Sequence, residues 1–264
     1  MEFFDSHCHL DDERFDKDRE RLIAEIKKAN ITKFVSAGYS IEGSKKGVEL
    51  SKKYDYIYTT CGISPNDIPQ DEDELWKNIE EISDLVKENI ENKKIVAIGE
   101  IGLDYYWEKD LQKRELQRQV FIKQIEIANV WNLPIVIHTR EAVMDTLEIL
   151  KKYTVNRKGV FHCCPLNREL VKEALKLGFY ISFAGPITFK NSKNAKEIIE
   201  MVPNDKMLIE TDSPYLAPEP VRGTRNDPRN VQYIAKKIAE IKGMTLEEVA
   251  KMTYENTKEI FGIK

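Results

Sequence analysis

Short apolar runs alternate with longer amphipathic stretches along the whole chain. The apolar runs have the length of buried strands, and they predict strands at Phe3–His7, Lys33–Ala37, Tyr56–Gly62, Ile95–Ile101, Pro134–His138, Gly159–His162, Tyr180–Phe183 and Met207–Glu210. The stretches between them space their apolar residues as helices do, and they predict helices at Asp16–Asn30, Asp73–Ile90, Leu111–Val130, Glu141–Tyr153, Arg168–Leu177 and Ala195–Met201. Two further helices are expected near Val231–Lys242 and Leu246–Phe261.

Eight strands that alternate with helices predict parallel βαβ units. At 264 residues, the expected fold class is α/β, a (β/α)8 TIM-like barrel that spans residues 1–264 as a single domain. A doubly wound open sheet is the alternative, but such sheets usually carry a glycine-rich phosphate loop after the first strand. This chain has the tripeptide His7-Cys8-His9 at that place, and no low-complexity linker divides it.

All four histidines of the chain fall at the ends of predicted strands. His7 and His9 form an H-x-H pair, and a spacing of two places both side chains on the same side of a strand. His138 and His162 each end an apolar run of their own. Because neutral imidazole is a good ligand for zinc and similar divalent ions, the four residues are candidate metal ligands.

Two carboxylates complete the pattern, Glu100 in the fourth predicted strand and Asp212 just after the eighth. A single catalytic ion usually takes three protein ligands and a water, so six candidates favour two divalent ions. We assign His7, His9 and Asp212 to one ion, His138 and His162 to the other, and Glu100 to a bridging position. Taken singly, each residue also fits a hydrogen-bonded core position, a helix cap or an ion pair. The ligand types suit Zn, Mn, Mg or Ni.

The composition limits the partners and the cellular location that we expect for the protein. The formal net charge of −4 argues against nonspecific coating of nucleic acid, although it does not exclude a nuclease. No apolar run is long enough for a transmembrane helix, and no signal peptide is recognised, so we expect a cytoplasmic protein without a membrane partner. The four cysteines, Cys8, Cys61, Cys163 and Cys164, lack C-x-x-C spacing and are typical of buried free thiols.

With these motifs in place, the chain resembles the TatD-type metal-dependent deoxyribonucleases of the amidohydrolase superfamily. The resemblance covers nearly the whole length and rests on the segments Asp5–Leu10, Gly99–Tyr105, Pro134–Arg140, His162–Cys163, Glu210–Leu216 and Arg222–Pro228. It implies a TIM-like barrel, one or two divalent metals and hydrolysis of phosphodiester bonds, often as a DNA 3′-exonuclease.

Two positions refine the resemblance. Superfamily relatives often bridge their metals with a carboxylated lysine on the fourth strand, whereas Ile95–Ile101 contains no lysine and Glu100 occupies the corresponding place. Family members commonly have histidine in Gly-(Ile/Val)-His-Pro after the third strand, where this chain has Ser64. A serine hydroxyl can donate to a substrate phosphate but cannot replace an imidazole ligand.

The predicted function is therefore that of a metal-dependent hydrolase, a 3′–5′ exodeoxyribonuclease that uses a water activated by two metals and acts on single-stranded DNA or 3′ ends. Asp212 is the expected general base, assisted by Glu100 as a catalytic ligand. Arg140, Arg222, Arg225 and Ser64 are candidates for holding phosphate, and Asp104 for orienting a ligand histidine. Tyr105, Tyr106 and Trp107 either stack on bases or pack against the barrel rim.

Three other functions stay open at this stage. The first is a metal-dependent amidohydrolase or phosphoesterase that acts on a small molecule. The second is a metal-binding scaffold without catalysis, and the third is a barrel enzyme that uses no metal. Assays with small esters and phosphodiesters, together with metal analysis of the purified protein, discriminate among them.

Overall fold

The computed structural model describes residues 1–264 and contains all eight predicted strands. They are β1 (Phe3–Cys8), β2 (Ile31–Ala37), β3 (Ile57–Cys61), β4 (Ile95–Asp104), β5 (Ile135–Arg140), β6 (Gly159–Phe161), β7 (Tyr180–Phe183) and β8 (Met207–Ile209). The helices are α1 (Arg19–Lys28), α2 (Ile41–Lys53), α3 (Glu72–Asn89), α4 (Leu111–Val130), α5 (Val143–Lys152), α6 (Arg168–Lys176), α7 (Ala195–Met201), α8 (Val231–Lys242) and α9 (Leu246–Phe261). The predicted strands and helices are thus confirmed, with ends that differ by a few residues.

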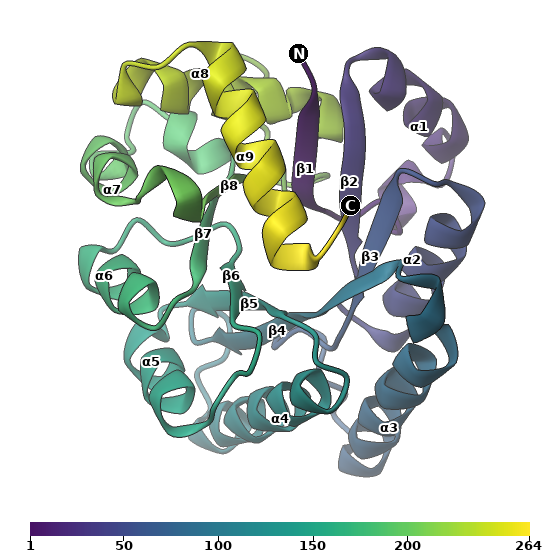
Figure 1. Ribbon diagram of the computed structural model, residues 1–264. Coiled ribbons are helices and arrows are strands. Elements are labelled where there is room, and N and C mark those ends of the chain that lie inside the picture. The colour runs from purple at the N-terminus through teal and green to yellow at the C-terminus, as the bar shows by residue number, and fades with distance from the viewer. The chain divides into compact units, whose positions relative to one another are not determined.

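The chain divides into two compact units, and the first of them is built from both ends of the sequence. It comprises residues 1–36 and 162–264. Within it, β1 pairs in parallel with β2, and β7 pairs in parallel with β8. The C-terminal helix α9 packs along β1 and β8 (Figure 1). The amino end of the chain is therefore held next to its last strand.

The second unit comprises residues 37–161 and contains the middle four strands. Its strands β3, β4, β5 and β6 pair in parallel and in chain order. The long helix α4 covers β4, and α2 packs against β3 (Figure 1). Parallel strands of this kind bury both faces, which explains why β4 is buried along its whole length.

Helix α2 was not among the helices predicted from the sequence. Its buried face consists largely of small residues, including Gly43, Ser44, Gly47 and Ser51. These residues let the helix approach the end of β3 closely, where the Ser44 hydroxyl accepts a hydrogen bond from the backbone N–H of Gly62 at 3.2 Å. Because small residues give little amphipathic contrast, the helical spacing is weak in the sequence.

Strand β4 is longer than predicted, and this corrects the placement of Glu100. The apolar run ends at Ile101, but the strand continues to Asp104. The pairing with β5 shifts in register between Ile98 and Ile101. Within that shift, the backbone N–H of Glu100 donates to the carbonyl of Gly38 at 2.6 Å. Glu100 thus lies inside the strand, at an irregularity, and not at its end.

Candidate metal centre

The H-x-H pair brings two imidazole nitrogens together at the end of β1. The Nε2 atoms of His7 and His9 lie 3.3 Å apart, as the strand alternation predicts. The backbone fixes this position, because the carbonyl of His7 accepts from the N–H of Asp212 at 2.9 Å and the N–H of His9 donates to the carbonyl of Ser213 at 2.7 Å. The residues that follow β8 are thereby tied to β1.

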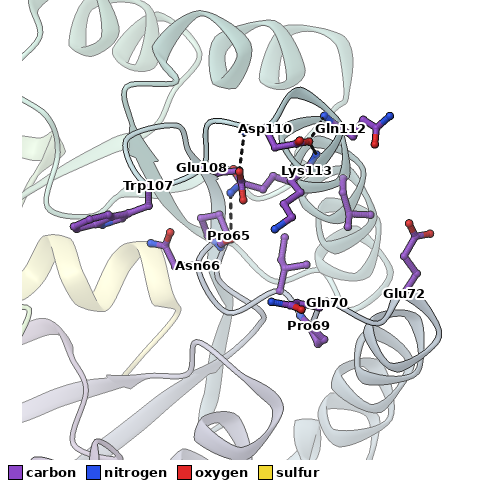
Figure 2. Close-up of a pocket in the computed structure, with 13 residues that line it drawn as sticks. Pro65, Asn66, Pro69, Gln70, Glu72, Trp107, Glu108, Asp110, Gln112 and Lys113 are labelled. Carbon is purple, nitrogen blue, oxygen red and sulfur yellow. Dashed lines mark hydrogen bonds between the residues drawn. The ribbon is translucent and has the colours of Figure 1, made fainter.

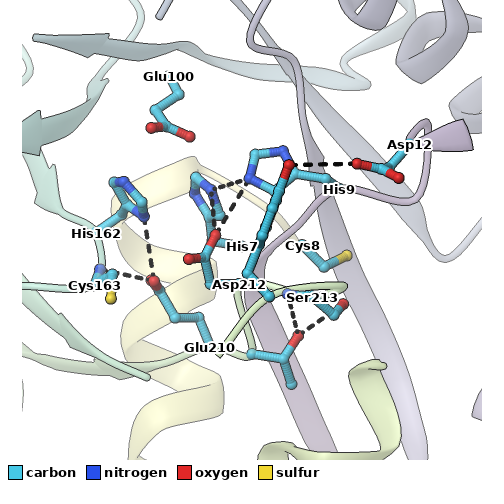
Figure 3. A network of polar contacts seen from close by, with 12 residues as sticks. His7, Cys8, His9, Asp12, Glu100, His162, Cys163, Glu210, Asp212 and Ser213 are labelled. Atoms are coloured by element: carbon cyan, nitrogen blue, oxygen red, sulfur yellow. Dashed lines mark hydrogen bonds and ion pairs between the residues drawn. The ribbon is translucent and has the colours of Figure 1, made fainter. Parts of the chain in front are cut away.

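Asp212 and His162 join the pair to form a buried cluster of four side chains (Figure 3). One carboxylate oxygen of Asp212 lies 3.2 Å from His9 Nε2 and 3.7 Å from His7 Nε2. The ring of His162 stacks on that of His7, with centroids 4.1 Å apart. Ligand atoms of His7, His162 and Asp212 all lie within 4.8 Å of one another.

These separations fit a metal ion. Two ligands bound at about 2.05 Å and at the tetrahedral angle are about 3.3 Å apart, as zinc coordination requires. The spacings of 3.3 Å between His7 and His9 and of 3.2 Å between His9 and Asp212 agree with that value. Nitrogen and carboxylate donors are also the ligand types that catalytic divalent ions take.

Asp212 is held as a carboxylate by its neighbours. Burial by itself raises the pKa of Asp212, but the hydrogen bond from His9 and the nearby His162 outweigh this effect, and the pKa is lowered from its ordinary value. The group is therefore ionised at neutral pH, as a metal ligand or a proton acceptor must be.

Glu210 orients His162 and was not singled out from the sequence. Its side chain is fully buried, and one carboxylate oxygen lies 3.3 Å from His162 Nδ1 and accepts from the N–H of Cys163 at 2.7 Å. This contact assigns the proton to Nδ1 and leaves the Nε2 lone pair to a metal. The signal in the sequence is the spacing of two between Glu210 and Asp212, which is the spacing of His7 and His9.

The second unit brings Glu100 and His138 together. The Nδ1 atom of His138 lies 2.9 Å from a carboxylate oxygen of Glu100, and its Nε2 atom lies 3.0 Å from Asp104. Asp104 also accepts from the side-chain amide of Asn66 at 3.1 Å. Burial raises the pKa of Asp104, but the hydrogen bonds from His138 and Asn66 prevail and hold it at about 2. Asp104 thus has the contact expected of a residue that orients His138.

The candidate phosphate-binding residues differ in the contacts that their polar groups already make within the protein. The Ser64 hydroxyl donates to Asp67 at 2.8 Å, and both terminal nitrogens of Arg225 contact the carboxylate of Asp18 at 2.7 and 2.8 Å. Arg222 is half-exposed and lies over the ring of Phe189. Arg140 is exposed, and its guanidinium lies 3.8 Å from the centre of the Tyr106 ring.

Comparison with known proteins identifies the class to which this arrangement belongs. The fold superimposes on the crystal structure of YJJV, a TatD homologue from Escherichia coli K12, with a TM-score of 0.91 over 99% of this chain and 98% of that one, at 25% sequence identity. The fold is therefore a (β/α)8 barrel, as predicted from the alternation of strands and helices.

The model of the TatD-related DNase family matches residues 4–262, and the chain belongs to this family. It is 42% identical to the uncharacterized metal-dependent hydrolase YabD of Bacillus subtilis, over 98% of this chain and 99% of that protein. It is 37% identical to the uncharacterized metal-dependent hydrolase YcfH of Escherichia coli K12, over 100% and 97%. The protein is thus a metal-dependent hydrolase. No helix has the length and apolar content needed to cross a bilayer.

Proposed function

We propose that the protein is a deoxyribonuclease that removes nucleotides from the 3′ end of single-stranded DNA. The six predicted ligands, His7, His9, Glu100, His138, His162 and Asp212, would hold two divalent ions. The observation that carries the metal-binding part is the spacing of 3.2–3.7 Å among the donor atoms of His7, His9 and Asp212. The choice of DNA as substrate is supported by membership of the TatD-related DNase family.

The ligands are proposed to meet because, in a (β/α)8 barrel, the carboxyl ends of the strands form the active-site face. His7, His9, His162 and Asp212 come from the ends of β1, β6 and β8, and His138 comes from β5. Divalent ions held there supply positive charge that polarises water and neutralises phosphate oxygens.

The chain's own residues then have distinct tasks. Asp212 accepts the proton of the attacking water at a carboxylate oxygen, since its lowered pKa keeps it ionised. Arg140 pairs with nonbridging phosphate oxygens, because its exposed guanidinium has the planar donor geometry that phosphate requires. Asp104 and Glu210 keep the rings of His138 and His162 in fixed orientations.

The test is hydrolysis of a 5′-labelled single-stranded DNA oligomer by protein loaded with metal, compared with the same protein after treatment with chelator. We expect a ladder that shortens from the 3′ end, and we expect no cleavage by the chelated protein or by His138→Ala. Failure to cleave DNA with metal confirmed as bound contradicts the proposal, and it favours a phosphoesterase or amidohydrolase that acts on a small molecule.

Asp212→Asn tests the general base. The variant keeps the size of the side chain, so we expect it to retain at least one metal ion while turnover falls by about 10²- to 10⁴-fold, as loss of general base catalysis predicts. Metal content and turnover are measured on the same preparation, with the exposed Asp205→Asn as a matched control. Turnover near that of the wild type would refute the assigned role.

A further inference from the structure

The turn that follows β4 presents two aromatic rings to solvent. Trp107 is 67% exposed and Tyr106 is 40% exposed, although large aromatic side chains are usually buried. Their rings meet edge to face with centroids 4.7 Å apart. Arg140 lies over the Tyr106 ring at 3.8 Å from its centre, so the more exposed ring of Trp107 is the one that offers its surface to a ligand.

One carboxylate joins this turn to a predicted metal ligand. One oxygen of Asp104 accepts from the backbone N–H groups of Tyr106 and Trp107 at 2.9 and 3.1 Å. The other oxygen lies 3.0 Å from His138 Nε2. The aromatic turn and His138 are therefore both within hydrogen-bond reach of a single side chain, which fixes their relative position.

Two cations keep the turn in one conformation. Lys109 Nζ donates to the carbonyl of Tyr105 at 2.7 Å. Arg114 donates to the same carbonyl at 3.1 Å and to the carbonyl of Glu108 at 2.8 Å. A turn held in this way gives a preorganised surface, on which a ligand orders few additional groups when it binds.

Trp107 also borders a cavity of about 540 Å³ that lies between residues 65–72 and 107–117 (Figure 2). This volume lies in the range of small-ligand sites. The amide side chains of Asn66 and Gln70 line it and can donate to and accept from the edge of a base. The carboxylates of Glu72, Glu108 and Asp110 and the ammonium group of Lys113 also line it, and the excess of negative charge disfavours a phosphate inside the cavity.

We propose that Trp107, which Tyr106 supports edge to face, forms a stacking platform for an unpaired nucleobase of a single-stranded substrate, with the cavity receiving the base and Arg140 the adjoining phosphate. Arg140 is suited to this task because its guanidinium lies 3.8 Å from the centre of the Tyr106 ring and 5.7 Å from that of Trp107. Stacking on an exposed ring requires a base that is free of its partner strand. This inference rests on the proposed function, and it adds the residues that would hold a base of the single-stranded substrate.

Binding of a 5′-fluorescent single-stranded oligomer, followed by anisotropy, tests the platform. The full chain carries Asp212→Asn, so that the oligomer survives the titration, and Trp107→Ala, Trp107→Phe or the exposed Val130→Ala is added to it. Base stacking on an aromatic side chain predicts that Trp107→Ala weakens binding about 5- to 150-fold. Trp107→Phe retains a ring and most of the affinity, and Val130→Ala changes nothing. An unchanged affinity for Trp107→Ala, or no binding by the parent chain, overturns the platform.

A second comparison uses protein with Asp212 intact and an oligomer whose last 3′ residues lack bases. We expect the wild type to have a higher kcat/KM for the natural oligomer than for the base-free one. We expect Trp107→Ala to have similar values for the two oligomers, and its value for the base-free oligomer should equal that of the wild type. Cleavage with the preference retained in Trp107→Ala refutes the platform but leaves the nuclease proposal intact. Binding that depends on Trp107, without cleavage of either oligomer, supports the platform but refutes the nuclease proposal.

Discussion

Buried carboxylates contact the rings of two predicted metal ligands, His138 and His162. Glu210 contacts Nδ1 of His162, whereas Asp104 contacts Nε2 of His138. In the proposed site, His162 would offer Nε2, and His138 would offer Nδ1, which lies 2.9 Å from Glu100. A carboxylate partner also raises the basicity of the ligand ring, so these residues contribute to metal affinity without touching the metal.

Replacement of Glu210 by glutamine tests this contribution. The variant keeps the shape of the side chain and an oxygen for the Cys163 N–H, but it removes the negative charge that faces His162. We expect metal affinity to fall by about 10-fold or more, in the range found for such partners. Titration against a competing chelator measures the change. The exposed Glu247→Gln serves as control, and equal affinity in the two variants would show that Glu210 has no such role.

At the scale of the element, β4 carries two carboxylates of the candidate site, Glu100 and Asp104. Glu100 and Asp104 lie four residues apart and contact opposite nitrogens of the His138 ring. Between them is Gly102, with φ of 141°, where a Cβ atom would stand 2.0 Å from the carbonyl oxygen of His138. The absence of a side chain at this position lets β4 and β5 run close together, and both carboxylates can then reach the ring.

Gly102→Ala should therefore be strongly destabilising. The added methyl group meets backbone rather than a flexible side chain, and we expect a loss of about 3 kcal/mol or more in the free energy of unfolding. Gly223 has φ of 89° and no atom near the position of its Cβ, so Gly223→Ala should cost only about 1 kcal/mol of backbone strain. Urea denaturation compares the two variants. Similar losses would show that the contact with β5 is unimportant.

Prediction from the sequence succeeded where the local pattern was strong. The apolar runs gave the eight strands, and the H-x-H spacing placed His7 and His9 on one side. It failed at α2, whose buried face is largely glycine and serine, and at the end of β4, where Gly102 interrupts the apolar run after Ile101. The small-residue face of α2 and the end of β4 depend on how closely a neighbouring element approaches. The periodicity of apolar residues along the chain does not predict such an approach.

The contacts of Glu210 and of Asn66 were missed for a related reason. Glu210 meets a histidine 48 residues away, and Asn66 meets Asp104 38 residues away. Only the fold brings these residues together, so a local motif identifies the ligands more readily than the groups that orient them.

At the scale of the whole molecule, contacts between segments far apart in sequence hold the first unit together. The loop after β8 reaches back to the start of α1, where Arg225 contacts Asp18 through two hydrogen bonds. Arg229 contacts Glu25 at 2.7 Å in the same region. These ion pairs join segments that are about 200 residues apart, and they restrain the loop that carries Arg222.

The pair between Asp18 and Arg225 predicts a dependence of stability on pH. The hydrogen bond from Arg225 lowers the pKa of Asp18 in the folded protein. Its stabilising effect is therefore complete above the pKa of about 3.9 of an unfolded aspartate, and it is lost as the pH falls through the lower folded value. We expect Asp18→Asn to cost up to about 1 kcal/mol at pH 7, as for other surface pairs, and less at more acidic pH.

Urea denaturation of the wild type and of Asp18→Asn at several pH values between 7 and 3 measures this difference. The exposed Asp84→Asn is the matched control, and its stability should follow that of the wild type throughout. The contrary result is a difference in the free energy of unfolding between Asp18→Asn and the wild type that is the same at every pH. That result would show that the contribution of the Asp18–Arg225 pair to stability does not depend on the charge of Asp18.

The construction of the first unit from both ends of the chain also has a consequence during protein synthesis. His7 and His9 leave the ribosome early, but Asp212, which contacts both, is added 203 residues after His9. At 5–20 residues per second, this is a delay of about 10–40 s. The growing polypeptide therefore carries two adjacent imidazoles without their carboxylate partner during this delay, and the cluster closes only after Asp212 has been added.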